Sequence, residues 1–154
     1  MKRSNHARKL FFLTVMIVFL AISSLAKAAP PVLQTQYGPD GIEVDLIRCK
    51  VSDNVLSVAF LVRSTTEKSV SVDFDIEAVH YLANNKKYHV LKDEKGNWLS
   101  GPQNLRGGGS RIYLESSKDS KIVWYKFPAP PEDVKKIQIN SDEIMPFDDV
   151  EVQR

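Results

Sequence analysis

The sequence predicts an all-β protein, with about eight short antiparallel strands arranged as a two-sheet sandwich. From residue 41 onward, apolar and polar residues alternate with the two-residue period of half-buried strands. Beyond the first 28 residues, no window of eleven or more residues has the period of a helix. Turn-forming residues separate the alternating segments at short intervals, which is typical of sandwich domains.

The first three strands are predicted from their alternation. Residues 41–51 place apolar side chains on one parity up to Leu46 and on the opposite parity from Ile47, so a β-bulge is expected between them. Residues 54–63 and 69–76 each present one apolar face. These two faces consist of Leu56, Val58, Phe60 and Val62, and of Val70, Val72, Phe74 and Ile76.

Six further strands and their connections follow from shorter patterns. Asn84-Asn85 tolerates positive φ and predicts a tight hairpin, while Asp93–Gly96 and Ser117–Ser120 predict two other turns. Pro128–Pro131 is expected to form an extended crossover at a sheet edge, because proline cannot donate to a central ladder. Residues 99–110, with three consecutive glycines, predict a flexible loop. The six strands are expected at 78–83, 86–92, 111–115, 121–127, 134–140 and 147–152.

The N-terminal segment predicts export. Residues 1–9 contain four Lys or Arg residues and no acidic residue, residues 10–22 form an apolar run, and Ala26 and Ala28 occupy the −3 and −1 positions of a cut after residue 28. This order is that of a secretory signal peptide, and the apolar run is shorter than the roughly 18–20 residues that span a bilayer. The alternative is an uncleaved membrane anchor. We therefore expect a signal peptide at 1–28 and one domain at 29–154, located in the periplasm or outside the cell.

Charge and cysteine content narrow the classes of partner. The signal segment holds five of the 21 basic residues, so the rest of the chain has 16 basic and 19 acidic residues and a net charge of −3. Such a domain lacks the basic surface that nucleic acid requires. Cys49 is the only cysteine, which excludes an intramolecular disulfide, and it lies too far downstream to be a lipid-attachment site. A soluble product without a stable membrane anchor is expected.

Two histidines offer the one arrangement suited to metal or acid–base chemistry. If Asn84-Asn85 forms the hairpin turn, paired residues have numbers that sum to 169, and His80 lies opposite His89 with the Cβ atoms about 5 Å apart. A metal site needs further ligands, and none is close in sequence. No metal site and no cofactor are therefore expected, and a metal-dependent or hydrolytic enzyme that uses His80 and His89 is the alternative.

Catalysis has little other support in the sequence. No serine occupies a G-x-S-x-G elbow, and no phosphate-cradling loop or HExxH motif is present. Cys49 lies on the parity of Ile47 and Val51, so it is expected to be a buried, unreactive thiol. The acidic residues at 73, 75 and 77 are expected to form a solvated strand face and not a calcium site.

Aromatic residues favour a binding function. Residues 121–127 are apolar on both faces, so this strand is either covered on both sides or presents one face as a contact surface. Core packing is the expected state of Trp98 and Trp124. If Trp98 is exposed instead, then Trp98, Arg106 and Arg111 would form a binding site beside the glycine-rich loop, with the arginines donating to a carboxylate or phosphate.

Several segments resemble a family of uncharacterised secreted bacterial domains. Lys126–Ile137 and Pro146–Val150 resemble the C-terminal part of that family, and Val79–Leu82 with Lys87–Asp93 is similar to its hairpin. Members are immunoglobulin-like sandwiches, sometimes fused to outer-membrane-protein-A-type peptidoglycan-binding domains. The Ser117–Ser120 turn departs from the family by lacking Pro-Gly. The resemblance implies an immunoglobulin-like fold and an exported location, with no catalytic residues.

Together these patterns predict an exported, non-enzymatic immunoglobulin-like β-sandwich. Its expected role is that of a binding module for a protein or polymer of the bacterial cell envelope.

Overall fold

The computed structural model describes residues 30–102 and 111–154 of the chain. The described residues contain 11 strands in three sheets and no α-helix, and all the strand pairs are antiparallel. The predicted all-β class is confirmed, with more strands and one more sheet than expected. The signal-peptide prediction for 1–28 lies outside the described residues.

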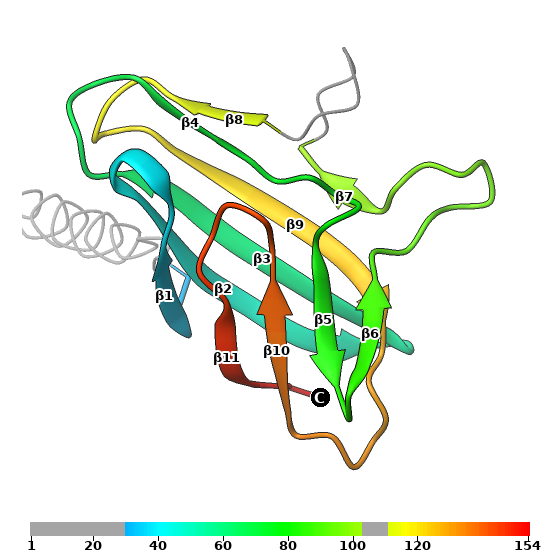
Figure 1. Cartoon of the computed structure of the whole chain (residues 1–154). Coiled ribbons are helices and arrows are strands. Elements are labelled where there is room, and N and C mark those ends of the chain that lie inside the picture. Colours follow the sequence, from blue (N-terminus) through cyan, green and yellow to red (C-terminus); the bar gives the residue numbers. More distant parts are fainter. Residues whose placement is uncertain (1–29, 103–110) are drawn as a thin grey trace, which may run out of the picture. The chain divides into compact units, whose positions relative to one another are not determined.

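Two larger sheets face each other across the core (Figure 1). Across the first sheet the order is β1 (Gln34–Tyr37), β2 (Ile42–Ser52), β3 (Val55–Ser64), β9 (Ser120–Pro128) and β7 (Ser100–Gly101). Across the second it is β11 (Phe147–Glu151), β10 (Lys136–Asn140), β5 (His80–Ala83) and β6 (Lys86–His89). A third sheet pairs β4 (Val70–Asp73) with β8 (Arg111–Leu114). A single 3₁₀ turn, η1 (Pro39–Gly41), connects β1 to β2.

The long strands β2 and β3 form because their apolar residues alternate. The predicted inward face of β3 is buried along its whole length. The register between β2 and β3 shifts between Leu46 and Arg48, so the expected bulge is present and lets both Leu46 and Cys49 reach the core. This insertion of one residue keeps β2 amphipathic across a change in sequence parity.

The β5–β6 hairpin has the predicted register. Asn84 and Asn85 both adopt positive φ, His80 pairs with His89, and Tyr81 pairs with Tyr88. The rings of Tyr81 and Tyr88 stack with their centroids 4.6 Å apart, and the Tyr81 hydroxyl donates to the carbonyl of Pro128 at 2.9 Å. These contacts join the hairpin to the end of β9 in the facing sheet.

The structure corrects the sequence prediction at three segments. β1 was not expected, because Gln-Thr-Gln-Tyr lacks an apolar alternation; it is an edge strand paired only with β2. Residues 99–110 were expected to form a loop, but Ser100–Gly101 is the strand β7. β4 ends at Asp73 and not at Ile76, since the chain turns where the Asp75 carboxylate accepts the Glu77 N–H at 3.0 Å.

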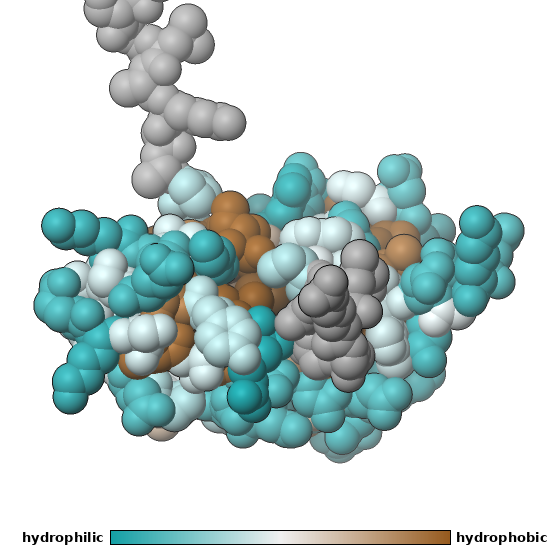
Figure 2. Space-filling view, turned by 90° about the horizontal axis from the view of Figure 1, so that it is seen from above, coloured by the Kyte–Doolittle hydropathy of each residue, from teal (hydrophilic) through white to brown (hydrophobic). Residues whose placement is uncertain are grey.

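Pro128 ends β9 opposite Val55, and the next residue, Ala129, donates its N–H to the Asn54 carbonyl at 3.0 Å. The prolines therefore lie where the ladder stops, as their missing donors require. Viewed from the end of the molecule near β4 and β8, much of the surface is hydrophilic and surrounds smaller hydrophobic areas (Figure 2). The described part of the chain has no helix long and apolar enough to cross a membrane.

Candidate functional site

The side of the five-stranded sheet that faces away from the core carries an exposed apolar strip, here called the outer strip. On β9, Ile122 is 53% exposed and Trp124 is 40% exposed. Their cross-strand partners on β3 are Leu61 and Ala59, both half-buried. Four apolar side chains from two neighbouring strands thus form one continuous surface, in which Ile122 and Trp124 are exposed.

Trp124 is held in place by a glycine. Gly101 of β7 pairs with Trp124, and a Cβ atom built on Gly101 would lie 2.7 Å from the indole Nε1 and 2.9 Å from Cζ2. The indole therefore packs directly on the β7 backbone, where any side chain at 101 would displace it. The result is a fixed aromatic surface on the sheet, and the expectation that Trp124 packs in the core is wrong.

Basic side chains border one end of the outer strip. Arg48 pairs with Ala59, and Lys50 pairs with Ser57, which also pairs with Lys126. The Lys126 ammonium donates to the Ser57 hydroxyl at 2.6 Å. Within residues 30–102 and 111–154, none of these three cations makes an ion pair with a carboxylate. They leave positive charge available beside Trp124.

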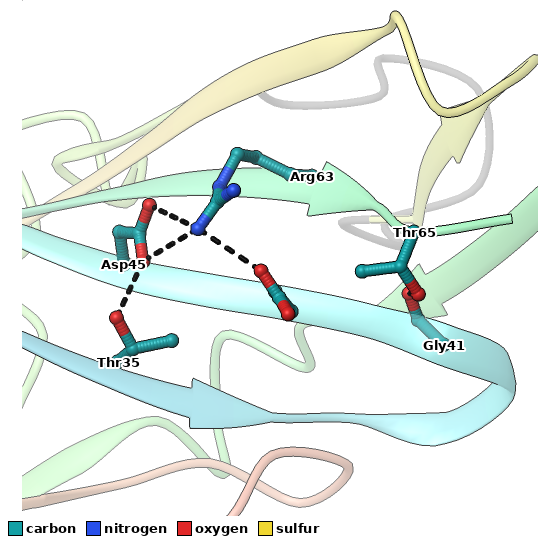
Figure 3. A network of polar contacts seen from close by, with 6 residues as sticks. Thr35, Gly41, Asp45, Arg63 and Thr65 are labelled. Atoms are coloured by element: carbon teal, nitrogen blue, oxygen red, sulfur yellow. Dashed lines mark hydrogen bonds and ion pairs between the residues drawn. The ribbon is translucent and has the colours of Figure 1, made fainter.

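A polar network borders the other end (Figure 3). The Asp45 side chain is only 3% exposed, accepts a hydrogen bond from Thr35 Oγ1 at 2.7 Å, and forms an ion pair with Arg63 Nη2 at 2.9 Å. Arg63 Nη2 also lies 3.0 Å from Glu43 Oε2. Hydrogen bonding to Asp45 raises the pKa of the Arg63 guanidinium above its usual value. Here one guanidinium binds two carboxylates of β2, and Thr35 of β1 donates to one of them, so this end serves to join β1, β2 and β3.

Of the predicted Trp98–Arg106–Arg111 site, two members are described. Trp98 is half-buried against the core cluster at the end of the 93–97 turn, and the Lys92 ammonium lies 3.8 Å from the centroid of its ring. Arg111 begins β8, is exposed, and forms an ion pair with Asp73 at 3.4 Å. Arg106 lies outside the described residues, so the three-residue site stays a prediction.

Cys49 is buried, as expected. Burial raises the pKa of its thiol from 9.0 to about 12, so the thiolate that a nucleophile needs is disfavoured.

The two histidines lie opposite each other on the exposed side of the β5–β6 hairpin. Their ring centroids are 6.1 Å apart, and His80 Nδ1 lies 2.6 Å from the carbonyl oxygen of Ala78. No group of three or more His, Cys, Asp or Glu side chains in the described residues is arranged to hold a metal ion.

Two cavities among the described residues differ in size and lining. A cavity of about 10 Å³ lies between the sheets below residues 141–146 and is lined mainly by apolar side chains, among them Phe60, Phe74 and Ile144. An open groove of about 560 Å³ runs beside Asp148 and Asp149, and its lining contains no His, Ser or Cys.

Sequence reasoning identified the strand of Trp124 as apolar on both faces but did not place its outer face in solvent. It missed Arg48, Lys50 and Lys126 because their proximity depends on pairing across three strands. No family model, curated protein or solved structure matches this chain.

Proposed function

We propose that this protein is an exported, non-catalytic binding module of the bacterial cell envelope, and that the outer strip is its contact surface. The signal-like segment at 1–28 supports export to the periplasm or beyond the cell. The similarity of Lys126–Ile137 and the β5–β6 hairpin to uncharacterised secreted domains supports an immunoglobulin-like sandwich in that location. The single observation that carries the binding role is the exposure of Ile122 and Trp124 on a strand that pairs with β3 along its whole length.

The exposure is informative because β9 pairs with β3 along its whole length and also with β7 at Trp124, so this part of the strand is not a frayed edge. Contiguous apolar surface on a small soluble domain marks contact sites more often than chance exposure does. The indole also packs against the Gly101 backbone, a contact that limits its freedom before binding and so reduces the side-chain entropy lost when a partner covers it.

The indole of Trp124 and the basic side chains beside it favour a partner that has both sugar rings and anionic groups. The flat indole of Trp124 can accept the apolar face of a sugar ring, and its Nε1–H provides a polar edge. Arg48, Lys50 and Lys126 would then donate to carboxylate or phosphate groups along the polymer. An anionic envelope polymer satisfies both requirements.

The alternative of an enzyme based on His80 and His89 has weaker support. The hydrogen-bond partner of His80 Nδ1 is a backbone carbonyl, whereas a catalytic pair is usually oriented by a carboxylate.

Co-sedimentation with purified cell-wall sacculi, which carry sugar rings and carboxylates, tests the proposal. The wild-type protein is expected to sediment with the sacculi, and less so as salt rises. The I122T/W124T variant has β-branched threonine at both positions, which suits a strand, and it should remain in the supernatant. Y113T changes an exposed aromatic residue on β8 and should behave as wild type.

Equal sedimentation of wild type and I122T/W124T would refute the outer strip as the contact surface, provided both proteins melt cooperatively. Absence of wild-type sedimentation at low salt would refute the polymer as partner.

A further inference from the structure

We infer that His80 and His89 form a binding site for a single divalent transition-metal ion, with Cu²⁺ the favoured ion. This inference is independent of the outer strip, because the histidines lie in the four-stranded sheet.

The register brings the two imidazoles close together. Counting from the two-residue Asn84-Asn85 turn, hydrogen-bonded and non-hydrogen-bonded pairs alternate, which makes His80–His89 a non-hydrogen-bonded pair. Side chains approach most closely in such pairs. Both imidazoles therefore lie side by side on the same face of the hairpin, with His89 exposed and His80 half-buried.

The ring separation agrees with two ligands on one ion. A metal–nitrogen bond of about 2.0–2.1 Å places each ring centroid about 3.2 Å from the metal. Two such rings are then about 4.5 Å apart when the nitrogens are at right angles and about 6.4 Å apart when they are opposite. The observed 6.1 Å lies within this range, and the exposed His89 ring can rotate to adjust its direction.

The contact of His80 with Ala78 prepares the ring for metal binding. A backbone carbonyl can only accept a hydrogen bond, so Nδ1 of His80 carries the proton and donates at 2.6 Å. In the neutral ring, Nε2 then holds the free lone pair. Metal-ligating histidines typically donate their other ring nitrogen to a carbonyl or carboxylate in this way, which fixes both tautomer and ring orientation.

The ligand set indicates which ion. Two imidazole nitrogens with the remaining positions filled by water suit the tetragonal geometry of Cu²⁺. Cu²⁺ also binds nitrogen ligands more tightly than the neighbouring divalent metals. Hard cations such as Mg²⁺ and Ca²⁺ require oxygen ligands and should not bind here.

Titration of the untagged full chain with a Cu²⁺ salt, followed by electron paramagnetic resonance, tests the site. The protein used in the titration carries the substitution His6→Gln, so that His80 and His89 are its only histidines. It is the parent of the variants below. One Cu²⁺ per chain is expected, with hyperfine coupling to two imidazole nitrogens. Mg²⁺ at the same concentration should not compete.

A position exchange is the matched control. K87H/H89K has the same composition and charge and keeps two histidines on the same face, but it no longer places them opposite each other. Its Cu²⁺ affinity is expected to fall at least about tenfold. Once one imidazole has bound the ion, the second is no longer held at a high effective concentration beside it. The Cu²⁺ affinity of H89Q, a substitution at an exposed position, should fall by the same factor.

Cu²⁺ affinity of K87H/H89K within twofold of the parent, or a signal from a single imidazole nitrogen in the parent, would overturn the inference. Either variant must show the parent's melting profile without metal, and the hairpin turn itself is unchanged in both.

Discussion

The Asp45–Arg63 ion pair makes an asymmetric prediction about stability. Asp45 is almost wholly buried on the outer side of the sheet, whereas the Arg63 side chain is 41% exposed and has a second partner in Glu43. The two members of the pair therefore differ in what each leaves behind when the other is removed. Removing Arg63 leaves a buried carboxylate, but removing Asp45 leaves a cation that still reaches both solvent and Glu43.

The magnitudes follow from this difference. Removing one partner of a buried pair typically costs about 3–5 kcal/mol, and because water can enter the space left by the exposed Arg63, we expect R63M to cost about 3 kcal/mol. D45V, which introduces an apolar side chain of similar size and high β propensity, should cost about 1.5–2 kcal/mol, the lower part of the range for charge-assisted hydrogen bonds. The double variant D45V/R63M should be more stable than R63M alone, since no uncompensated charge remains.

Urea unfolding of the four proteins measures these terms, with equal m-values as the requirement for comparison. The reasoning is refuted if R63M loses less than about 1 kcal/mol. It is refuted equally if the double variant loses the sum of the two single losses, because the pair would then have no coupling. T35V, which removes one donor to Asp45, should lie between wild type and R63M.

Three further outcomes are expected. In urea unfolding, Y81F should lower the free energy of unfolding by about 1–2 kcal/mol, because the Pro128 carbonyl loses its donor. Y125F should not lower it, since the Tyr125 hydroxyl has no hydrogen-bond partner among the described residues. Equal losses in the two variants would contradict this reasoning. The pKa of the Cys49 thiol is raised in the folded state, so its contribution to the free energy of unfolding is fully present below pH 9.0 and is lost as pH rises toward about 12. Over that interval the free energy of unfolding should fall by up to about 1.4 kcal/mol per pH unit because of this group. A pH series of unfolding curves should show that C49A lacks this part of the slope. N85A should lower stability by about 1–2 kcal/mol, because alanine is strained at the positive φ of residue 85, while N85G should match or exceed wild type in thermal melts.

Much of the fold was predictable because local chemistry determines it. The parity change at Leu46–Ile47 could only be reconciled with one core by a bulge, and Asn84-Asn85 fixed the register of the hairpin together with the pairing of His80 and His89. β1 and β7 were not predictable in this way. Their residues have no periodic signal, and each forms a strand only because a long neighbour, β2 or β9, offers hydrogen bonds to it.

The candidate site was predictable only in part. An apolar pattern on both faces of residues 121–127 indicates two possible environments, and only the packing of distant strands decides which face is left in solvent. Leu61 and Ala59 complete the outer strip. In the sequence they alternate with core residues at positions where a half-buried strand usually has its solvent-facing side chains, so the sequence does not show that they belong to a contact surface. The basic neighbours of Trp124 come from three strands, so their proximity depends on long-range pairing.

The packing of Trp124 on Gly101 has a consequence for sequence variation. The two positions are 23 residues apart in the chain, yet no side chain fits at 101 while the indole occupies its present position. They should therefore vary together: a lineage that gains even an alanine at 101 must first reduce or redirect the residue at 124. If Trp124 stays in place, an alanine at 101 would displace the indole, so a single substitution outside the proposed contact surface can disturb that surface.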